Sequence, residues 1–405
     1  MKIVVQKFGG TSMGTVENRQ KVAEKIIAAK KSGFHPVVVV SAIGRNGDPY
    51  ATDTLIQFAE KAYKDTHPRE LDLLMSCGEI ISCVVMVNTL RSNGYDAYAL
   101  TGGQAGIITS GPYGNSFVLR VEPHNIIKVL NEGKIPVVAG FQGMREDGNI
   151  TTLGRGGSDT TAAILASALS AQFIEVYTDV DGIMTADPRI VPSAKFLKTI
   201  SYLEVFQIAD QGGKVIHPRA VEIAMESNIP LIIKNTMNDS PGTLITSYHH
   251  LQKPRGEKKD MKIVTGIAHI TNRSQITIDG MGAELEDRIL IDLAENNISI
   301  DLINIFPDKM IFTIDGKDTG KAEEILKDCK YKYGIIHNCS KISVIGNGMR
   351  GVPGVMSRII RALSKNGINV LQTSDSHTTI SCLVHGDDTV GAVVALHEEF
   401  ELWRN

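Results

Sequence analysis

Residues Val4–Ser12 read VVQKFGGTS, a short apolar strand that ends in a Gly-Gly turn, with a lysine before the turn and two hydroxyls after it. Because glycine lacks a Cβ atom, the N–H groups of Gly9 and Gly10 can approach an anion closely. Lys7 adds a positive charge beside them. This stretch predicts a strand followed by a turn that binds phosphate.

A helix is predicted after the turn, over Val16–Ile27, with Thr11 and Ser12 as its N-cap residues. The spacing matches neither the Walker motif nor the dinucleotide motif, so taken alone the turn could also be a strand–helix connection without a ligand. A second loop of the same kind, LGRGGSDTTAA at Leu153–Ala163, again places paired glycines, hydroxyls and charges before an apolar helical run. Two such loops favour the phosphate-binding interpretation.

The composition excludes several classes of protein. With 405 residues, 42% of them hydrophobic, the chain can form two or three domains with a large core. Its formal net charge of -3 argues against nucleic acid as a partner. The sequence shows no secretory leader and no apolar run that approaches a membrane span. Five cysteines without paired Cys-x2-Cys spacing indicate reduced thiols rather than a zinc site, and we expect a cytoplasmic protein.

Up to about residue 245, short apolar runs alternate with helical stretches. The run Val37–Val40 consists only of valine, which favours a strand buried on both faces of a parallel sheet. We therefore expect an α/β three-layer sandwich, with helices on both sides of the sheet. The predicted strands are Ile3–Val5, Pro36–Val40, Ala97–Leu100, Pro136–Ala139, Phe173–Tyr177 and Pro230–Ile233.

Residues 246–262 are polar and basic, without apolar periodicity, and predict a linker. Two segments of similar plan follow it, residues 263–338 and 339–405. In each, a strand leads through a glycine-containing turn into a helix, two further strands and a second helix, which are the first five elements of the βαββαβ pattern predicted here. The likeness of the two segments predicts tandem modules.

Polar side chains follow several of the predicted strands, where open parallel sheets bind ligands. Phosphoryl transfer needs cations and backbone donors around the moving phosphate. Lys7 and Lys214 would supply cations, and Asp159 would orient the lysines or approach magnesium. The polar residues concerned are Ser41, Glu79, the second glycine loop Arg155–Thr161, Thr178, Asp179, Asp181 and Lys214.

Two of these residues suggest a substrate that carries both a carboxylate and an amino group. Arg155 can form a fork to a carboxylate. Glu79, at a predicted helix start, can hold an ammonium, with an ordinary first-turn glutamate as the alternative. The acidic stretch Thr178–Arg189 lacks the remaining ligands of an EF-hand, so we reject calcium there. His217 is predicted to pack beside Pro218.

Taken together, these motifs resemble the aspartokinase family of the amino acid kinase superfamily. The likeness covers essentially the whole chain, because the C-terminal modules resemble the tandem ACT domains, of ferredoxin-like type, in that family. The closing stretch looks most like the Gram-positive, diaminopimelate-sensitive type. The motifs are QKFGGTS at the start, VVVVSAIGR at 37–45, SCGE at 76–79, AGFQG at 139–143, GRGGSDTTA at 154–162, YTDVDGIMTADPR at 177–189 and GGKVIHPRA at 212–220.

The resemblance implies ATP-dependent phosphorylation of the side-chain carboxylate of L-aspartate to 4-phospho-L-aspartate, on the route to lysine, threonine, methionine and diaminopimelate. It implies a kinase domain at 1–245, a linker at 246–262, and ACT domains at 263–338 and 339–405 whose strands can be interleaved. Mg²⁺ would arrive with ATP and need no protein cage. The implied residues are Lys7, Asp159 and Lys214 for catalysis; Ser41, Thr52, Glu79, Arg155, Gly156, Gly157 and Ser158 for aspartate; and Lys7, Phe8, Gly9, Gly10, Thr178, Asp179 and Lys214 for ATP.

By the same resemblance, the ACT modules would pair across a homodimer and bind an amino-acid effector that inhibits the enzyme. Diaminopimelate, lysine and threonine remain open as effectors, with the resemblance leaning toward diaminopimelate. The matching turns lie at 279–282 and 347–354. The effector residues would be Asp279, Met281, Gly282, Met349, Val352, Ser374 and Asp375.

Two other functions remain open at this point. A kinase of the same superfamily with another substrate, such as acetylglutamate or uridylate, would share the glycine loops, and a substrate panel would distinguish it. A non-catalytic ACT sensor of amino acids is the second alternative. Such a sensor would need none of Lys7, Asp159 and Lys214, so their presence argues against it.

Overall fold

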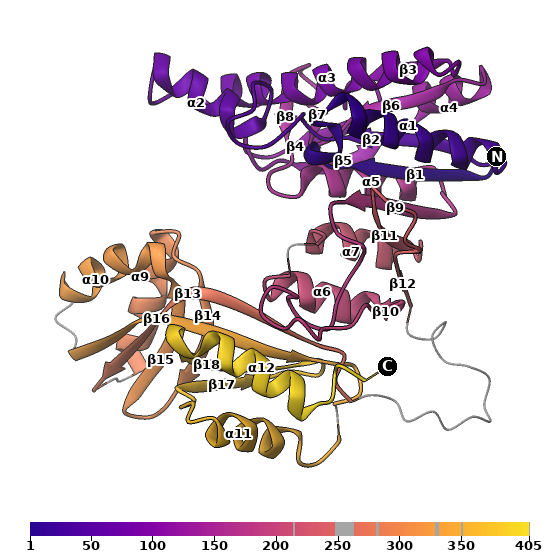
Figure 1. Ribbon diagram of the computed structural model, residues 1–405. Helices are drawn as coiled ribbons and strands as arrows, with labels where there is room; N and C mark the ends of the chain where they lie inside the picture. Colours follow the sequence, from indigo (N-terminus) through magenta and orange to yellow (C-terminus); the bar gives the residue numbers. More distant parts are fainter. Residues whose placement is uncertain (214, 248–262, 281–282, 329–331, 350, 405) are drawn as a thin grey trace. The chain divides into compact units, whose positions relative to one another are not determined.

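The computed structural model describes residues 1–213, 215–247, 263–280, 283–328, 332–349 and 351–404, which form two compact units (Figure 1). The first unit comprises Met1–Ile183, Phe196–Ala209 and the described residues 215–247. The second unit comprises Met184–Lys195, Asp210–Gly213 and the described residues 263–404. Lys214, Met281, Gly282 and most of the predicted linker lie outside the described residues.

An eight-stranded sheet forms the centre of the first unit, in the order β10-β12-β11-β9-β1-β2-β6-β3. All neighbours from β11 to β3 are parallel, whereas β12 runs antiparallel to β11. This confirms the predicted parallel α/β sheet. The strands are β1 (Ile3–Phe8), β2 (His35–Val40), β3 (Ala97–Leu100), β6 (Ile135–Ala139), β9 (Phe173–Thr178), β10 (Thr199–Ser201), β11 (Leu231–Asn235) and β12 (Thr243–Thr246).

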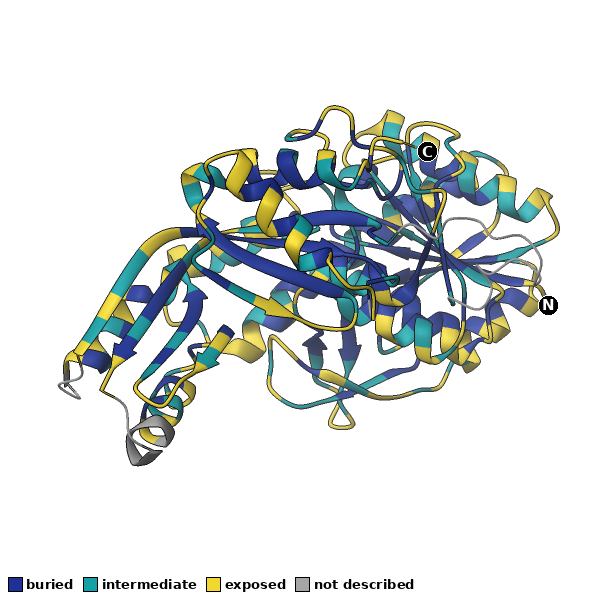
Figure 2. Cartoon of the chain, turned by 90° about the horizontal axis from the view of Figure 1, so that it is seen from below, coloured by how far each residue is buried: buried dark blue, intermediate teal, exposed yellow. Residues whose placement is uncertain are grey.

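Helices cover both faces of this sheet, as the fully buried valines of β2 require. Val38 and Val40 belong to one core cluster with residues of α1 and α3, and α5 packs on β1, β2 and β9. The outward positions of the helices are exposed, while the strands are mostly buried (Figure 2). The helices are α1 (Val16–Lys31), α2 (Thr52–Ala62), α3 (Pro68–Ser92), α4 (His124–Asn131), α5 (Gly157–Ala168), α6 (Tyr202–Asp210) and α7 (Pro218–Glu226).

A smaller four-stranded sheet, in the order β5-β4-β7-β8, was not predicted from the sequence. Its strands are only three to five residues long and mix polar with apolar residues, so they leave no periodic signal. They are β4 (Ile107–Ser110), β5 (Phe117–Val121), β7 (Gln142–Met144) and β8 (Ile150–Thr152).

Helix α3 is a core helix of the first unit. In the described part of the chain it is the one helix long and apolar enough to cross a membrane, which differs from the sequence expectation, and half of its most apolar window is buried. Its Asp72 is fully buried and accepts hydrogen bonds from Gly114 N (3.0 Å), Thr152 N (2.9 Å) and Thr152 Oγ1 (2.7 Å). These bonds tie α3 to the small sheet.

The second unit contains a six-stranded sheet in the order β14-β15-β13-β16-β18-β17, and its two central strands have 14 residues each. The strands are β13 (Gly266–Asp279), β14 (Ile300–Ile305), β15 (Lys309–Asp315), β16 (Lys332–Ile345), β17 (Gln372–Asp375) and β18 (Thr379–His385). The helices are α9 (Ala283–Glu295), α10 (Thr319–Asp328), α11 (Val355–Lys365) and α12 (Thr389–Glu399).

Strands β13 and β16 each serve two βαββαβ modules. The second half of β13 pairs with β15 and with the first half of β16, next to α9 and α10. The first half of β13 pairs with the second half of β16, which also pairs with β18, next to α11 and α12. A bulge near Arg273 separates the two halves. The described chain has no strand after α12, and the first half of β13 fills that place in the second module.

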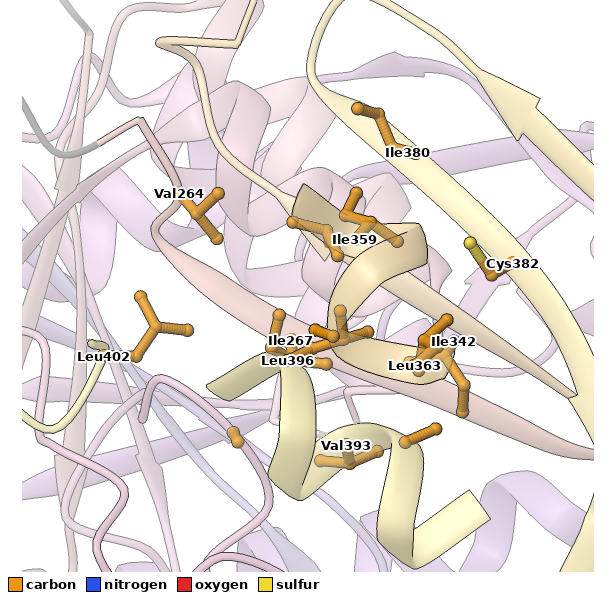
Figure 3. Packing of buried hydrophobic residues seen from close by; sticks show 14 of the residues in the cluster. Val264, Ile267, Ile342, Ile359, Leu363, Ile380, Cys382, Val393, Leu396 and Leu402 are labelled. Carbon is orange, nitrogen blue, oxygen red and sulfur yellow. The ribbon is translucent and has the colours of Figure 1, made fainter. Parts of the chain in front are cut away.

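The second module has a continuous apolar core between its strands and its two helices. Ile342, Ile359 and Leu396 are fully buried in it (Figure 3). This core also contains Ala186, Val191 and Ala194, which come from a segment far earlier in the sequence. The second module is thus built from three separate stretches of the chain.

Candidate active site

The carboxyl ends of the parallel strands β11, β9, β1, β2 and β6 lie at one edge of the large sheet. The residues that follow these strands therefore gather at this edge. Ser41, directly after β2, donates its N–H to Phe8 O at the end of β1 (3.1 Å). Thr236, after β11, donates its N–H to Thr178 O at the end of β9 (3.0 Å). The topology brings motifs that are distant in the sequence into one site.

The first glycine turn packs directly against the loop that follows β2. A Cβ atom on Gly10 would lie 2.6 Å from the carbonyl oxygens of Ala42 and Gly44, so only glycine fits there. Gly44 also donates its N–H to Gly10 O (3.0 Å). This close approach fixes the backbone of the turn.

The predicted N-cap after this turn is wrong. Thr11 and Ser12 lie in a 3₁₀ turn, Gly10–Met13, and α1 begins after Thr15, whose side chain accepts a hydrogen bond from the first turn of the helix (3.1 Å). Ser12 Oγ instead lies 2.7 Å from Thr236 Oγ1 in a buried position. The 3₁₀ turn separates the glycines from α1, which the sequence pattern did not indicate.

Lys7 and Asp159 form an ion pair that joins the two glycine loops. Lys7 Nζ lies 2.7 Å from Asp159 Oδ1, and the side chains are 12% and 13% exposed. The two atoms are close enough for an ion pair, but their angles do not meet those of a hydrogen bond. Asp159 lies in the first turn of α5, and its Oδ2 accepts a hydrogen bond from His217 N (3.3 Å). In such a sheltered position the pair interacts more strongly than it would in water.

The second glycine loop is held by close packing against two aromatic rings. Gly156, with φ +70°, precedes α5, and a Cβ atom there would lie 2.1 Å from the ring of His217. A Cβ atom on Gly157 would lie 2.6 Å from the ring of Phe141. Burial lowers the pKa of His217, against an opposing effect of Asp159. His217 thus packs on the loop and holds the Asp159 carboxylate through its main-chain N–H, a contact that its sequence motif did not reveal.

Glu79 lies in the middle of α3, so its predicted place at a helix start is wrong. The apolar run around it continues the helix from Pro68, and the side chain is only 2% exposed. Its Oε1 accepts a hydrogen bond from Ala42 N (3.2 Å), and its Oε2 has no hydrogen-bond partner among the described residues. Burial raises the pKa of this carboxyl to about 8. A buried carboxyl with one oxygen free is a suitable site for a cationic group.

The loop after β9 carries two carboxylates with different partners. Asp179 Oδ2 pairs with Arg45 Nη2 (2.7 Å), and both side chains are more than half exposed, so this pair contributes little stability. Asp181 Oδ1 accepts hydrogen bonds from Nδ2 of Asn235 (2.7 Å) and Nδ2 of Asn238 (2.8 Å). These bonds connect the loop after β9 to residues at and just after the end of β11. Arg45 lies within the motif VVVVSAIGR, and the sequence pattern carries no sign of its contact with Asp179.

Several predicted site residues make no side-chain hydrogen bond to the other candidate residues in the described chain. Thr52 begins α2, and Arg155 is exposed in the second glycine loop. In the described chain neither side chain hydrogen-bonds to another candidate residue. Ser158 does pack at the site, since a Cβ atom on Gly140 after β6 would lie 2.8 Å from its Oγ. Lys214 lies outside the described residues.

Those predicted effector residues that the structure describes lie at two ends of the second unit's sheet. Asp279 ends β13, opposite Lys309 in β15, and Met349 is buried in the core of the second module. Val352 is exposed in the turn before α11, and Ser374 and Asp375 are exposed at the end of β17.

Comparison with known proteins agrees with this architecture. The model of the amino acid kinase family matches residues 2–235, and a model of the ACT domain matches residues 334–398. The aspartokinase 1 of Bacillus subtilis is 46% identical over 99% of this chain and 100% of its own length. The aspartokinase of Mycolicibacterium smegmatis is 39% identical over 99% of this chain and 97% of its own length.

Solved structures show the same likeness at lower sequence identity. Escherichia coli aspartokinase III in complex with aspartate and ADP, in its R state, is 25% identical with a TM-score of 0.80, covering 98% of this chain and 99% of that protein. The same enzyme with lysine and aspartate, in its T state, has a TM-score of 0.76 and 25% identity, covering 99% of this chain and 100% of that protein. With its parallel sheet, its two glycine loops and its ACT modules, this chain belongs to the aspartokinases of the amino acid kinase family.

Proposed function

We propose that the chain transfers the γ-phosphoryl group of ATP to the side-chain carboxylate of L-aspartate, giving 4-phospho-L-aspartate and ADP. The observation that carries the proposal is the sheltered Lys7–Asp159 pair between two glycine loops, at the carboxyl edge of a parallel sheet. The aspartate and ADP complex of the E. coli relative supports the same substrates.

Aspartate would bind near Glu79, whose free Oε2 offers a partner to the substrate ammonium. Arg155, exposed in the second glycine loop, would form a fork to a carboxylate. Ser158 and the N-terminus of α5 would provide further donors at the same edge. The proposed aspartate residues are Ser41, Thr52, Glu79, Arg155, Gly156, Gly157 and Ser158.

ATP would bind with its phosphates against the first glycine turn and Lys7. The described residues contain no group of three or more His, Cys, Asp or Glu side chains that could hold a metal ion. Mg²⁺ bound with the nucleotide phosphates would lower their charge. The proposed ATP residues are Lys7, Phe8, Gly9, Gly10, Thr178, Asp179 and Lys214, with Lys7, Asp159 and Lys214 as the catalytic set.

The reaction mainly requires that the protein position the aspartate carboxylate against the γ-phosphoryl group of ATP. A free aspartate carboxylate is ionised at neutral pH, so it can attack phosphorus without a general base. The protein must then hold two anionic groups together and stabilise the charge on the transferred phosphoryl group. Lys7 would contact phosphate oxygens, and Asp159 would orient the Lys7 ammonium from the opposite loop. Donors fixed in advance in this way supply much of the rate enhancement in such sites.

We also propose that the second unit binds an inhibitory amino acid and mediates homodimerisation. The lysine complex of the E. coli relative supports an amino-acid effector, and diaminopimelate, lysine and threonine remain candidates. The proposed kinase domain is 1–245, followed by a linker at 246–262 and ACT domains at 263–338 and 339–405. The sharing of β13 and β16 between the modules supports interleaving of the two ACT domains.

The test is ADP release with a panel of acceptors, namely L-aspartate, L-glutamate, N-acetyl-L-glutamate and uridylate. We expect turnover with L-aspartate and about a thousandfold loss of kcat in Lys7→Ala. Lys25→Ala is the matched control, because it removes another lysine–aspartate ion pair. Lys25 lies in α1, and its Nζ is 2.5 Å from Asp239 Oδ1. Turnover with a different acceptor and none with aspartate would reject the proposal.

A further inference from the structure

Two short stretches inside the kinase sequence belong to the second unit. They are Met184–Lys195 and Asp210–Gly213, here called the anchor segments. The first begins three positions after Asp181, in the loop that follows β9. The second ends at the residue directly before Lys214. Both proposed nucleotide-binding stretches are therefore covalently continuous with chain that the second unit holds.

Thr185 attaches the first anchor segment through its main chain and its side chain. Ile267 N in β13 donates to Thr185 O (2.8 Å), which places Thr185 along the edge of this strand. Thr185 Oγ1 lies 3.0 Å from Nε2 of His397 in α12, and both residues are buried. The same hydroxyl oxygen accepts a hydrogen bond from Lys195 N (2.9 Å), which closes the segment on itself. Thr185 thus links a strand, a helix and both ends of its own segment.

Apolar packing strengthens this attachment. Ala186, Val191 and Ala194 are buried in the core of the second module, in one cluster with Leu396 and Leu402. Leu396 and Leu402 appear in the close view of that core (Figure 3). Three side chains of the first anchor segment therefore belong to the hydrophobic core, although other residues of the segment are exposed.

Gln211 attaches the second anchor segment to the opposite face of the same strands. Its Oε1 accepts a hydrogen bond from Ser343 Oγ (2.9 Å), which lies 2.9 Å from Ser381 Oγ. Ser343 alternates along β16 with Ile342 and Val344, which face the helices, so it points to the other side of the sheet. These hydrogen bonds are buried, and a buried polar group left without a partner is costly.

The backbone of the second anchor segment also lies tightly on the sheet. Gly212 has φ +102°, and a Cβ atom there would lie 2.3 Å from His269 O in β13. A displacement of β13 relative to β16 would therefore move Gln211 and Gly212, which directly precede Gly213 and Lys214 in the sequence. Both anchor segments contact the sheet at β13 and β16. The first lies along the edge of β13 and contacts α12, and the second lies on the opposite face of the sheet.

We propose that Thr185 and Gln211 are positioning residues through which the second ACT module sets the geometry of the ATP-binding loops. This rests on the proposed function of those loops. An effector that shifts β13 against β16 would pull on both loops at once, through chain that is continuous with them. Allosteric coupling then requires no direct contact between effector and nucleotide.

The experiment compares wild type with Thr185→Val, Gln211→Leu and the double variant. We expect the Kd for ADP and the KM for ATP to rise about fivefold or more, while the KM for aspartate changes less than twofold. Inhibition by diaminopimelate, lysine or threonine, whichever inhibits the wild type, should weaken by about the same factor, with effector binding retained. Thr185→Ser keeps the hydroxyl and should restore the wild-type values.

Thr319→Val is the matched control, since it removes a buried hydrogen bond to Ser274 Oγ (2.8 Å) in the same unit without touching an anchor segment. ADP binding is measured directly and does not depend on turnover. If the wild type binds ADP but does not phosphorylate aspartate, the proposed function is rejected, while the ADP affinities of the variants still test this inference. Thermal unfolding of each variant shows whether it folds. The inference is overturned if the anchor variants keep wild-type ADP affinity, or if Thr319→Val weakens it equally.

Discussion

The buried carboxyl of Glu79 allows a prediction with a worked magnitude. Burial raises its pKa from an ordinary 4.5 to about 8. The folded state therefore holds this proton more tightly than the unfolded state, so stability falls as pH rises between these two values. The full difference corresponds to about 5 kcal/mol, of which about 3 kcal/mol is already lost at pH 7. Glu79→Gln mimics the neutral carboxyl and removes this pH dependence.

Urea unfolding of the ligand-free protein at pH 5 and pH 8.5 provides the assay. At pH 8.5 we expect Glu79→Gln to be more stable than the wild type by about 3 kcal/mol, because the new amide also lacks one partner. At pH 5 it should be no more stable. The control is Glu204→Gln, a buried glutamate that accepts hydrogen bonds from Ser201 N (3.1 Å) and Oγ (2.5 Å), and it should destabilise at both pH values.

Catalysis should change in the opposite direction to stability. If only the ionised Glu79 binds the substrate ammonium, kcat/KM for aspartate should rise about tenfold per pH unit below pH 8 and level off above it. Glu79→Gln should raise the KM for aspartate about a hundredfold and abolish this slope, as expected for the loss of a charged hydrogen bond. A wild type with pH-independent kcat/KM between pH 6 and 8, or a variant with an unchanged KM, would refute the reasoning.

The remaining predictions concern the loops and the core. Lys7→Ala should keep the unfolding temperature within a few degrees and lose about a thousandfold in kcat, measured by ADP release; a variant with wild-type kcat would contradict the catalytic role. Gly156→Ala should destabilise by about 2–3 kcal/mol, because of its positive φ and the ring of His217, and His217→Ala should relieve part of this cost in a double-mutant cycle. Asp72→Ala should cost about 3 kcal/mol in urea unfolding, since it leaves the two buried donors of Thr152 and the partly buried N–H of Gly114 without their acceptor; a cost below about 1 kcal/mol would argue against this account.

Much of the fold could be predicted from local pattern. Apolar runs such as Val37–Val40 indicated buried parallel strands, and such strands place their following residues at one edge. The prediction that both glycine loops bind phosphate rested on the likeness of the two loops. Their meeting through Lys7 and Asp159 is a contact over more than 150 positions, visible in the sequence only as the likeness of the two loops.

Other features depend on tertiary packing and left no local signal. Glu79 lies mid-helix, because the apolar run around it extends α3 far beyond the motif that drew attention to it. The N-cap of α1 is Thr15, because the chain first forms a 3₁₀ turn over Gly10–Met13. The attachment of Thr185 to the second unit depends on a partner more than 200 residues away.

The central claim is that this site phosphorylates the side-chain carboxylate of aspartate. An acyl phosphate reacts with hydroxylamine, whereas ADP release alone does not report where the phosphoryl group went. We predict that MgATP, L-aspartate and hydroxylamine together give aspartyl hydroxamate in amounts equal to the ADP released, and that Lys7→Ala gives neither. ADP release at saturating aspartate without any hydroxamate would contradict the account.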